Sequence, residues 1–297
     1  MKKSYEFSRY YKIASLISLM IFFFSTFFLI FKGLNYGVDF KGGTLIELKT
    51  EEDKYKIEDI RNAFNELDLE DLTVKKFGSS NEFIVKFKRS NINDTNFIKN
   101  IKINLDKYIE NFSFRRVENV GPKVSSELLA DGITAISIAL AAMLIYIWFR
   151  FEWQFSIGAI IAVFHDVVIT LGIFSLLGLE INLSIVAAVL TIVGYSMNDT
   201  VVIFDRVREN LMKYSDIKIF ELTNISINET LSRTLITSVT TLLALFSIFF
   251  FGGEILKGFS FAMILGVILG TYSSIFISNP VLIFLRVSQR TLIKEKD

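Results

Sequence analysis

Six apolar runs divide the chain, and each is long enough to cross a membrane as a helix. The first run, residues 13–31, contains no charged residue and comes close to the roughly 20 apolar residues that a transmembrane helix requires. A polar segment, residues 32–131, separates it from the other runs. Those runs cover residues 132–149, 153–179, 181–204, 234–251 and 258–285. The pattern predicts a membrane all-α bundle of six transmembrane helices, of which residues 132–285 form the second to the sixth, with one soluble domain inserted after the first helix.

The N-terminal run has the features of a membrane anchor. Four basic residues precede it: Lys2, Lys3, Arg9 and Lys12. The run is longer than the apolar core of about 7–15 residues in a cleaved signal peptide, and no A-x-A cleavage motif follows it. We therefore expect residues 1–31 to form a cytoplasmic N-terminus and an uncleaved first helix.

The basic residues of the short loops predict the orientation of the helices. Lys and Arg accumulate in short loops on the cytoplasmic side of a membrane protein. The N-terminus, the turn at Arg150, the segment 206–233 and the tail 286–297 hold 14 of them, whereas the opposite short loops hold only Lys257. We expect both termini, including the tail, to be cytoplasmic and the polar domain 32–131 to lie outside, in the periplasm.

Within residues 32–131 the apolar pattern alternates between the strand and the helix period. The tract Gly78-Ser79-Ser80-Asn81 separates two alternating runs and predicts a hairpin. The predicted elements are, in order, a strand at 44–48, a helix at 57–67, strands at 72–77 and 82–87, a helix at 97–109 and a strand at 112–117. This β-α-β-β-α-β order is the ferredoxin-like arrangement. We expect an α+β ferredoxin-like (βαββαβ) extracytoplasmic domain without a catalytic constellation.

Composition supports a membrane protein and argues against several kinds of chemistry. Hydrophobic residues make up 52% of the chain, and the mean hydropathy is +0.46. The net charge of +1 gives no indication of a nucleic-acid partner. Without cysteine, and with His165 as the single histidine, the chain offers little for a metal site or a nucleophile–histidine pair. We expect no metal, no cofactor and no enzymatic activity.

The fourth apolar run carries a polar stripe that ends at a carboxylate. At 100° per residue, one narrow face of this helix collects small and polar side chains. Its members are Ser184, Ala188, Thr191, Tyr195, Asn198 and Asp199. Asp199 precedes the charged exit at Asp205 by six residues, about 9 Å along the axis. A charged Asp at the centre of a membrane helix costs about 2.5–3.5 kcal/mol, so Asp199 is expected to be protonated, paired or hydrated.

The fifth run supplies a candidate partner for Asp199. Its polar stripe consists of Arg233, Thr237, Thr240, Ala244 and Ser247. Arg233 lies at the same cytoplasmic end as Asp199, and its long side chain reaches toward Asp199 if the two stripes face each other. The alternatives are an Arg233 that only anchors the helix at the membrane surface and an Asp199 that forms a static hydrogen bond between helices.

The third run contains a second intramembrane carboxylate. Asp166 lies about 12 residues from the start of its helix, near the middle of the membrane, and a packing role and a proton-relay role are equally open for it. His165 precedes it directly, so the two side chains point about 100° apart and need not share an environment. We expect His165 to be structural.

Two glycine-containing patterns indicate structural features rather than chemistry. In the sixth run Ala262, Gly266, Gly270 and Ser274 recur every four residues and include a GxxxG motif, which allows helices to approach closely. We expect this face to contact a partner protein. The tract 37–43, which contains Asp39, Gly42 and Gly43, resembles a phosphate loop only superficially, because it lacks the GxxxxGK[ST] pattern.

Several stretches together resemble the SecF family of protein-export membrane proteins, in the SecD/SecF branch of the resistance–nodulation–division superfamily. In chain order they are Gly37–Thr44, Val120–Val124, His165-Asp166, Gly194–Val202, Asp205–Asn210, Leu231–Ser238 and Phe251–Gly253. The match covers nearly the whole chain, and Met197 is a conservative departure within it.

The resemblance implies a subunit of the bacterial cytoplasmic membrane that pairs with a separate SecD half. Such a complex is expected to use the proton motive force to help secretory polypeptides leave the SecYEG channel late in translocation. It also implies that Asp199 and Arg233 stand at the family's acidic and basic positions for proton passage, with Asp166 as a further candidate. Gly194, Tyr195, Asn198 and Thr237 would support them. Two other classes stay open: a proton-coupled exporter of small molecules or lipids, and a non-transporting membrane scaffold.

Overall fold

The chain forms two compact units. The computed structural model describes residues 5–51, 53–67, 69–76, 78–88, 96–214, 217–289 and 291. One unit combines Met1–Asn35 with Thr134–Asp297, and the other is Tyr36–Ile133. The predicted tail 286–297 is described through residue 289 and at residue 291, and its other residues lie outside the described part.

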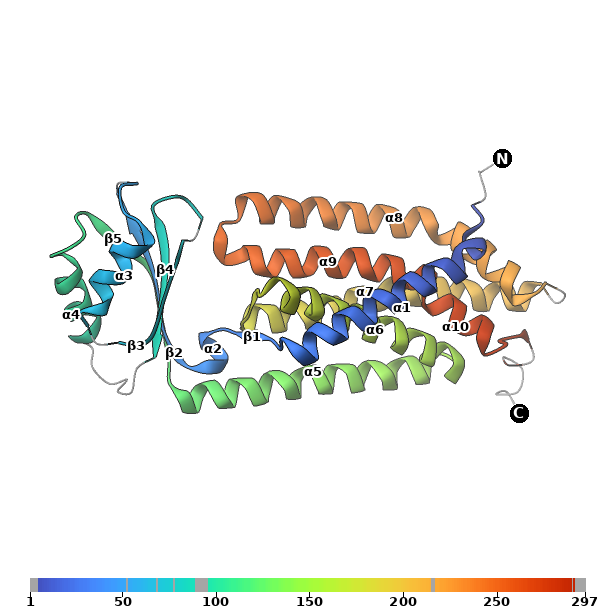
Figure 1. The fold of residues 1–297 in the computed structure, drawn as a ribbon. Helices are drawn as coiled ribbons and strands as arrows, with labels where there is room; N and C mark the ends of the chain where they lie inside the picture. The colour runs from blue at the N-terminus through green and yellow to red at the C-terminus, as the bar shows by residue number, and fades with distance from the viewer. Residues whose placement is uncertain are drawn as a thin grey trace. The chain divides into compact units, whose positions relative to one another are not determined.

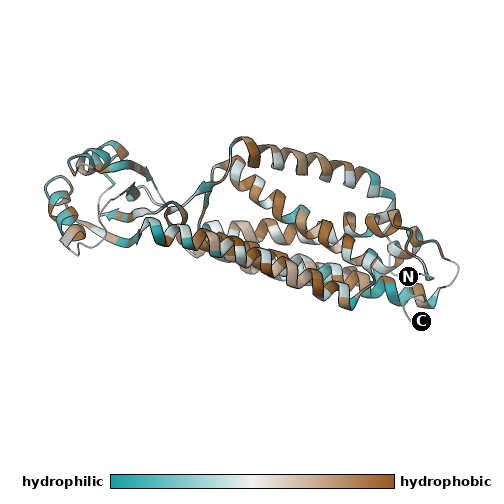
Figure 2. Cartoon of the chain, turned by 90° about the horizontal axis from the view of Figure 1, so that it is seen from below, coloured by the Kyte–Doolittle hydropathy of each residue, from teal (hydrophilic) through white to brown (hydrophobic). Residues whose placement is uncertain are grey.

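The first unit is helical (Figure 1). Its elements are η1 (Phe7–Tyr10), α1 (Tyr11–Phe31), α5 (Pro122–Arg150), α6 (Trp153–Leu177), α7 (Leu183–Lys213), α8 (Ile219–Phe251), α9 (Glu254–Phe276) and α10 (Ser278–Phe284). Of these, α5 begins within the other unit. The described residues contain six helical segments that are long and apolar enough to cross a membrane, with α9 and α10 forming the last one. Figure 2 shows apolar residues along most of their length.

The helices do not all end where the apolar runs end. The fourth run stops near Phe204, but α7 continues to Lys213, and α8 begins at Ile219, well before its apolar run. The predicted sixth span is interrupted at Ile277, where α9 gives way to α10. Helix ends depend on local hydrogen bonding rather than on hydropathy, so α7 and α8 extend beyond the apolar runs.

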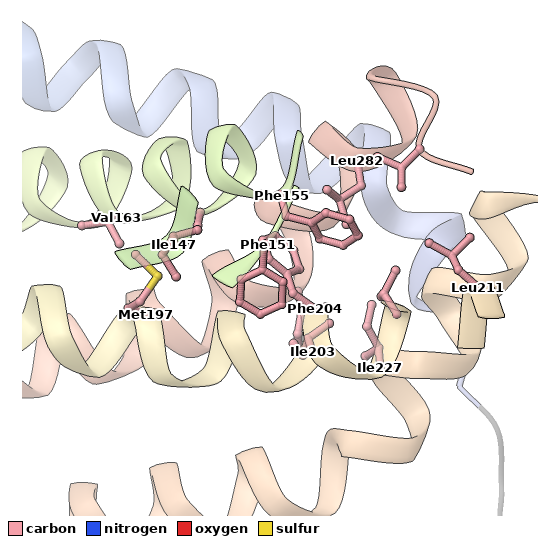
Figure 3. Close-up of a cluster of buried hydrophobic side chains, with 14 of the residues drawn as sticks. Ile147, Phe151, Phe155, Val163, Met197, Ile203, Phe204, Leu211, Ile227 and Leu282 are labelled. Atoms are coloured by element: carbon pink, nitrogen blue, oxygen red, sulfur yellow. The ribbon is translucent and has the colours of Figure 1, made fainter. Parts of the chain in front are cut away.

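An aromatic and aliphatic cluster packs α6, α7, α8 and α10 against one another in the half of the bundle that contains Phe155 and Phe204. Phe155 and Phe204 are fully buried, and their ring centroids lie 5.2 Å apart in an edge-to-face arrangement. Figure 3 shows these rings together with Phe151, Ile203 and Leu282. Edge-to-face aromatic pairs of this kind add about 0.5–1.5 kcal/mol beyond the area that they bury. The cluster therefore fixes the relative positions of the helices that carry Asp166 and Asp199.

The second unit is built around a four-stranded sheet. Its elements are α2 (Val38–Lys41), β2 (Gly43–Thr50), α3 (Ile57–Asn65), β3 (Glu70–Lys76), β4 (Glu82–Lys88), α4 (Asn96–Leu105) and β5 (Phe112–Val120). The strand order is β3-β4-β2-β5, and each neighbouring pair is antiparallel. The two-residue strand β1 (Asn35–Tyr36), at the unit boundary, forms a second small sheet with β6 (Glu180–Ile181).

Helices α3 and α4 supply the apolar core of this sheet unit. Ile46 and Leu48 of β2 are buried together with Ile60, Phe64 and Ile101 of the two helices. Apolar residues recur at strand spacing in β2 and at helical spacing in α3, which places each set on one face of its element. The predicted hairpin is present, with β3 and β4 on either side of residues 78–81.

Candidate functional site

Asp166 lies at a junction of three helices. It is on α6 and has no exposed surface. Ser196 of α7 and Ser273 of α9 each donate a hydrogen bond of 2.6 Å to its Oδ2 atom. Charge-assisted hydrogen bonds of this length are among the strong ones in proteins. The carboxylate therefore links α6, α7 and α9 at one point in the interior of the bundle.

His165 shares this environment, which corrects the expectation that neighbouring residues on a helix need not do so. Its Nδ1 atom lies 2.9 Å from Oδ1 of Asp166. The side chains leave the helix in different directions, but the imidazole is long enough to turn back toward its neighbour. His165 is 6% exposed, and its ring stacks against Phe22 of α1 with an interplanar angle of 8°. His165 and Asp166 thus form a buried dyad.

The glycines of α9 allow α7 to come close to the Asp166 junction. A Cβ atom at Gly270 would lie 3.0 Å from the Cα atom of Ser196, and one at Gly266 would overlap the side chain of Ile192. Small residues permit this approach between membrane helices. The GxxxG face therefore packs against α7 of the same chain, and the expectation that it contacts a partner protein is wrong.

Asp199 lies on α7, three residues after Ser196, and is 2% exposed. The positive charge of Arg233 and the hydroxyl of Ser238, both on α8, interact with Asp199. The Oδ2 atom of Asp199 has no hydrogen-bond partner, and within the described part of the chain Asp199 makes no ion pair of 4.0 Å or less. The two helices bring Asp199 and Arg233 near each other without joining them directly.

The polar stripes of α7 and α8 are largely on the outside of the bundle. On α7, Asn198 and Thr191 are exposed and Tyr195 is half-buried. On α8, Arg233 is exposed and Thr237, which donates a hydrogen bond to the Arg233 carbonyl, is half-buried. The remaining exposed members are Ser184, Thr240, Ala244 and Ser247. Most members of both stripes are therefore uncovered in this chain, whereas Asp199 at the end of the α7 stripe is buried.

Gly194 lies on α7 opposite α5. A Cβ atom there would be 3.7 Å from Cε of Met143, an ordinary van der Waals contact. In contrast to Gly270, this position has room for a methyl group. Gly194 therefore does not set the distance between α7 and its neighbour.

The tract Asp39–Gly43 is a tight structural corner in the sheet unit. Asp39 is half-buried in the first turn of α2. Gly42 and Gly43 have φ angles of +75° and +122°, which residues with a Cβ atom rarely adopt. A Cβ atom at Gly43 would also lie 2.8 Å from the carbonyl oxygen of Phe87. Both glycines are needed for backbone geometry where α2 turns into β2, and no phosphate-loop role is required to explain them.

A network of charged side chains, which the sequence did not single out, joins the polar ends of α5 to α8. Arg150 pairs with Asp205 at 2.7 Å, and Arg208 pairs with the buried Glu152 at 3.0 Å. Arg206 reaches Glu229 of α8 at 2.6 Å. The sequence signal for this network is the tract 205–210, in which acidic and basic residues lie three positions apart and so share a helix face. This network holds the helix ends that flank the candidate site.

The fold and the site define a class of protein. It is a multi-pass α-helical membrane protein with Asp166 and Asp199 buried within its long apolar helices and an α+β unit inserted after the first helix.

Comparison with known proteins gives the family. Residues 100–288 match the model of the C-terminal region of the protein export membrane proteins SecD and SecF, and residues 27–54 match the SecD/SecF GG motif. The protein translocase subunit SecF of Rickettsia bellii (strain OSU 85-389) is 42% identical over 285 residues, which cover 95% of this chain and 93% of the relative. SecF of Desulfurispirillum indicum is 44% identical over 262 residues, covering 86% and 83%. The chain belongs to the SecD/SecF family of bacterial protein-export membrane proteins.

Solved structures agree with this assignment. The crystal structure of SecDF, a translocon-associated membrane protein from Thermus thermophilus, superposes with a TM-score of 0.87 at 34% identity over 96% of this chain. A structure of SecDF in a super-membrane-facing form gives a TM-score of 0.71 at 33% identity over 100% of the chain. The chain spans 39% and 41% of the length of these two SecDF chains.

Proposed function

We propose that this chain is one half of a membrane complex with a SecD-type partner, and that the complex uses the proton gradient to assist late steps of Sec-dependent protein translocation. Membership of the family supports a role in Sec export. The single observation that carries the use of protons is Asp199: a carboxylate 2% exposed, with an unpartnered oxygen and an arginine nearby. Intramembrane carboxylates of this kind are costly and mark proton pathways.

The partner is supported by the exposed polar stripes. Asn198 and Thr191 of α7 and Arg233 of α8 lie on the surface of a mainly apolar bundle. Such groups are rarely left facing lipid, because hydrocarbon offers no hydrogen bonds. A second helical bundle that covers them supplies polar partners and encloses a path from Asp199 to the stripe of α8.

We further propose that both termini are cytoplasmic and that the sheet unit is a ferredoxin-like domain on the outer side. The strand order β3-β4-β2-β5 with α3 and α4 as connections supports the ferredoxin-like assignment. In this orientation the domain stands where a polypeptide leaves the SecYEG channel. The excess of Lys and Arg in the other short loops supports it.

The energy of the gradient is sufficient to shift a conformational equilibrium. One charge that crosses 100 mV gains about 2.3 kcal/mol. Protonation of Asp199 removes the charge that attracts Arg233, so α7 and α8 are free to adopt a different packing. A local change in charge that biases a two-state element is an established kind of switch.

The test is Asp199→Asn, which keeps the size and hydrogen bonding of the side chain but cannot ionise. We expect the complex to assemble and ATP-driven engagement of the channel to continue, while stimulation of export by the proton gradient is lost. Asp205→Asn is the matched control, because Asp205 is a partly exposed carboxylate on the same helix that pairs with Arg150. Full gradient-stimulated export by a well-expressed Asp199→Asn protein would refute the proposal.

A further inference from the structure

A cavity opens beside the His165–Asp166 dyad. It lies between α1 and α6 and has a volume of about 290 Å³. Its walls are mostly apolar, with Phe22, Ile161 and Phe164 among them, but Ser15, Ser18 and His165 also line it. A cavity of this volume has room for water.

The imidazole of His165, a residue that lines this cavity, has an unused nitrogen. Its Nδ1 atom is occupied by Asp166, whereas its Nε2 atom is buried and has no hydrogen-bond partner. In a neutral imidazole one nitrogen donates and the other accepts. Because Nδ1 faces a carboxylate oxygen, we assign the hydrogen to Nδ1, and Nε2 is then a free acceptor. A purely structural histidine would leave this acceptor unsatisfied at a cost in free energy.

Every other approach to Asp166 is occupied. His165 lies against Oδ1, and the hydroxyls of Ser196 and Ser273 cover Oδ2. The residue has no exposed surface. We propose that His165 takes a proton at Nε2 from water in the cavity and passes its Nδ1 proton to Asp166, so that the dyad is a protonation switch within the bundle. The proposal rests on the proton-driven function given above and adds a residue to it.

The step balances without any further reactant. A hydronium ion in the cavity gives its proton to Nε2 and becomes water. The Nδ1–H bond breaks, and that proton forms the O–H bond at Oδ1 of Asp166. The products are a neutral carboxylic acid and a neutral imidazole with its hydrogen on Nε2. The reverse transfer restores the first tautomer.

The structure indicates what this switch changes. Hydrogen bonds to a carboxylate are roughly twice as strong as those to a neutral group, so protonation weakens the bonds from Ser196 and Ser273. These two bonds join α6 to α7 and to α9. Ser196 lies one turn before Asp199 on the same helix. A proton on Asp166 therefore weakens the attachment of α7 to α6 at Ser196, one turn from Asp199.

Few other titratable groups face the dyad. From α1 the cavity receives Ser15, Ser18, Leu19 and Phe22, and from the segment after α9 it receives Ile277. Ser18 is hydrogen-bonded to the phenol of Tyr272, which donates to a backbone carbonyl of α1. Within the part of the chain that the structure describes, α7 and α9 each contribute one serine hydroxyl to the dyad. Among these described groups, His165 and Asp166 are the titratable pair in direct contact.

The chain offers a direct test, because it contains a single histidine. The full-length protein, purified with an affinity tag that contains no histidine, is labelled with ¹⁵N-histidine and placed in lipid nanodiscs with its partner unlabelled. The imidazole signals are followed between about pH 5 and pH 8, the range in which histidine usually changes charge. We expect both nitrogens to change tautomer or protonation in this range. Imidazole signals that stay fixed as the Nδ1–H tautomer throughout would overturn the proposal.

A functional measurement separates a proton carrier from a packing residue. His165→Gln keeps hydrogen-bonding capacity but cannot carry a proton, and we expect it to lose the pH dependence of gradient-stimulated export. Leu177→Ile changes a residue of the same helix that is 56% exposed and does not line the cavity, and it should keep the wild-type profile. A wild-type pH profile for His165→Gln would contradict the proposal.

The two proposals fail in different ways. Retained gradient stimulation in Asp199→Asn refutes the proton-driven function whatever the histidine signals show. Fixed histidine signals, combined with loss of stimulation in Asp199→Asn, refute only the role of His165.

Discussion

The contact between α7 and α9 should be sensitive to a single methyl group at Gly270. A Cβ atom there would lie 3.0 Å from the backbone Cα and 3.1 Å from the Cβ of Ser196, closer than nearly all Cβ contacts in proteins, so the neighbouring backbone would have to shift. A side-chain tip could rotate away, but a backbone atom cannot, so Gly270→Ala must push the two helices apart. Gly194→Ala is the matched control, because its methyl group would meet only the flexible end of Met143 at 3.7 Å.

The expected difference in unfolding free energy between the two variants follows from one stabilising and two destabilising contributions. Replacing Gly by Ala in a helix gains about 1 kcal/mol from helix propensity, and this gain is shared by both variants. Overpacking a tight interior costs about 1–3 kcal/mol, and only Gly270→Ala incurs it. Ser273 lies one turn after Gly270, so moving α9 also stretches its 2.6 Å bond to Asp166. A hydrogen bond to a charged group is worth about 1.5–3 kcal/mol, and part of that is lost.

We therefore expect Gly270→Ala to be less stable than Gly194→Ala by about 2–3 kcal/mol from these terms. The measurement is reversible unfolding of the full chain in mixed micelles by titration with SDS, followed by circular dichroism. Equal stability of the two variants would show that α7 and α9 are not in contact at this point. Larger substitutions at Gly266 or Gly270 would disrupt the chain itself, so a loss of co-purification with a partner would not identify an interface there.

Three further outcomes test other parts of the structure. Gly43→Ala should destabilise the sheet unit more than Gly33→Ala destabilises its own region, measured by hydrogen exchange, because both have positive φ but only Gly43 meets a backbone carbonyl within 3 Å; equal effects would contradict the steric argument. Burial raises the pKa of Glu47 in the folded protein. Between the ordinary Glu pKa of about 4.3 and this raised pKa, the folded unit keeps a proton that the unfolded chain releases. The free energy of unfolding therefore falls as the pH rises through this interval. The exchange-derived stability of Glu47→Gln relative to wild type should therefore increase over that interval, and a constant difference would count against it. In the cysteine-free chain, Ser80→Cys should react with an impermeant thiol reagent in intact spheroplasts and Ser288→Cys should not; equal labelling of both would refute the orientation.

Much of the fold follows from periodicity, and the reasons are local. Charge-free runs of about 20 residues have few stable conformations other than a membrane helix, so the six spans could be predicted. The hairpin around residues 78–81 and the helices at 57–65 and 96–105 follow from turn residues and apolar spacing in the same way. Apolar spacing does not fix where α7 and α8 end, because their polar extensions are held by ion pairs such as Arg206–Glu229 between distant segments.

The sequence predicts the site residues that stand out within one helix, but not the partners that packing between helices brings to them. Asp199 stands out because a carboxylate interrupts an apolar run, and the same reasoning found Asp166. The partners of Asp166 do not stand out, because serines are common in membrane helices and nothing in the sequence separates Ser196 and Ser273 from the others. Only the packing of α6, α7 and α9 selects these two. Position on a helical wheel also failed for His165, since a wheel gives the direction of the Cα–Cβ bond and not the reach of the ring.

The two buried aspartates, Asp166 and Asp199, differ in how far their carboxylate oxygens are hydrogen-bonded. Asp166 is fully satisfied by hydrogen bonds from three residues, whereas Asp199 has an unpartnered oxygen and lies next to the exposed stripe that we assign to a partner. Because Ser196 and Asp199 are one turn apart on α7, a change at either carboxylate is felt at the other through a single rigid element. A double-mutant cycle of Ser196→Ala and Asp199→Asn should therefore show a coupling energy above the 0.3–0.5 kcal/mol or so that independent sites show, measured by the same SDS titration. Additive effects would mean that the dyad and Asp199 act separately.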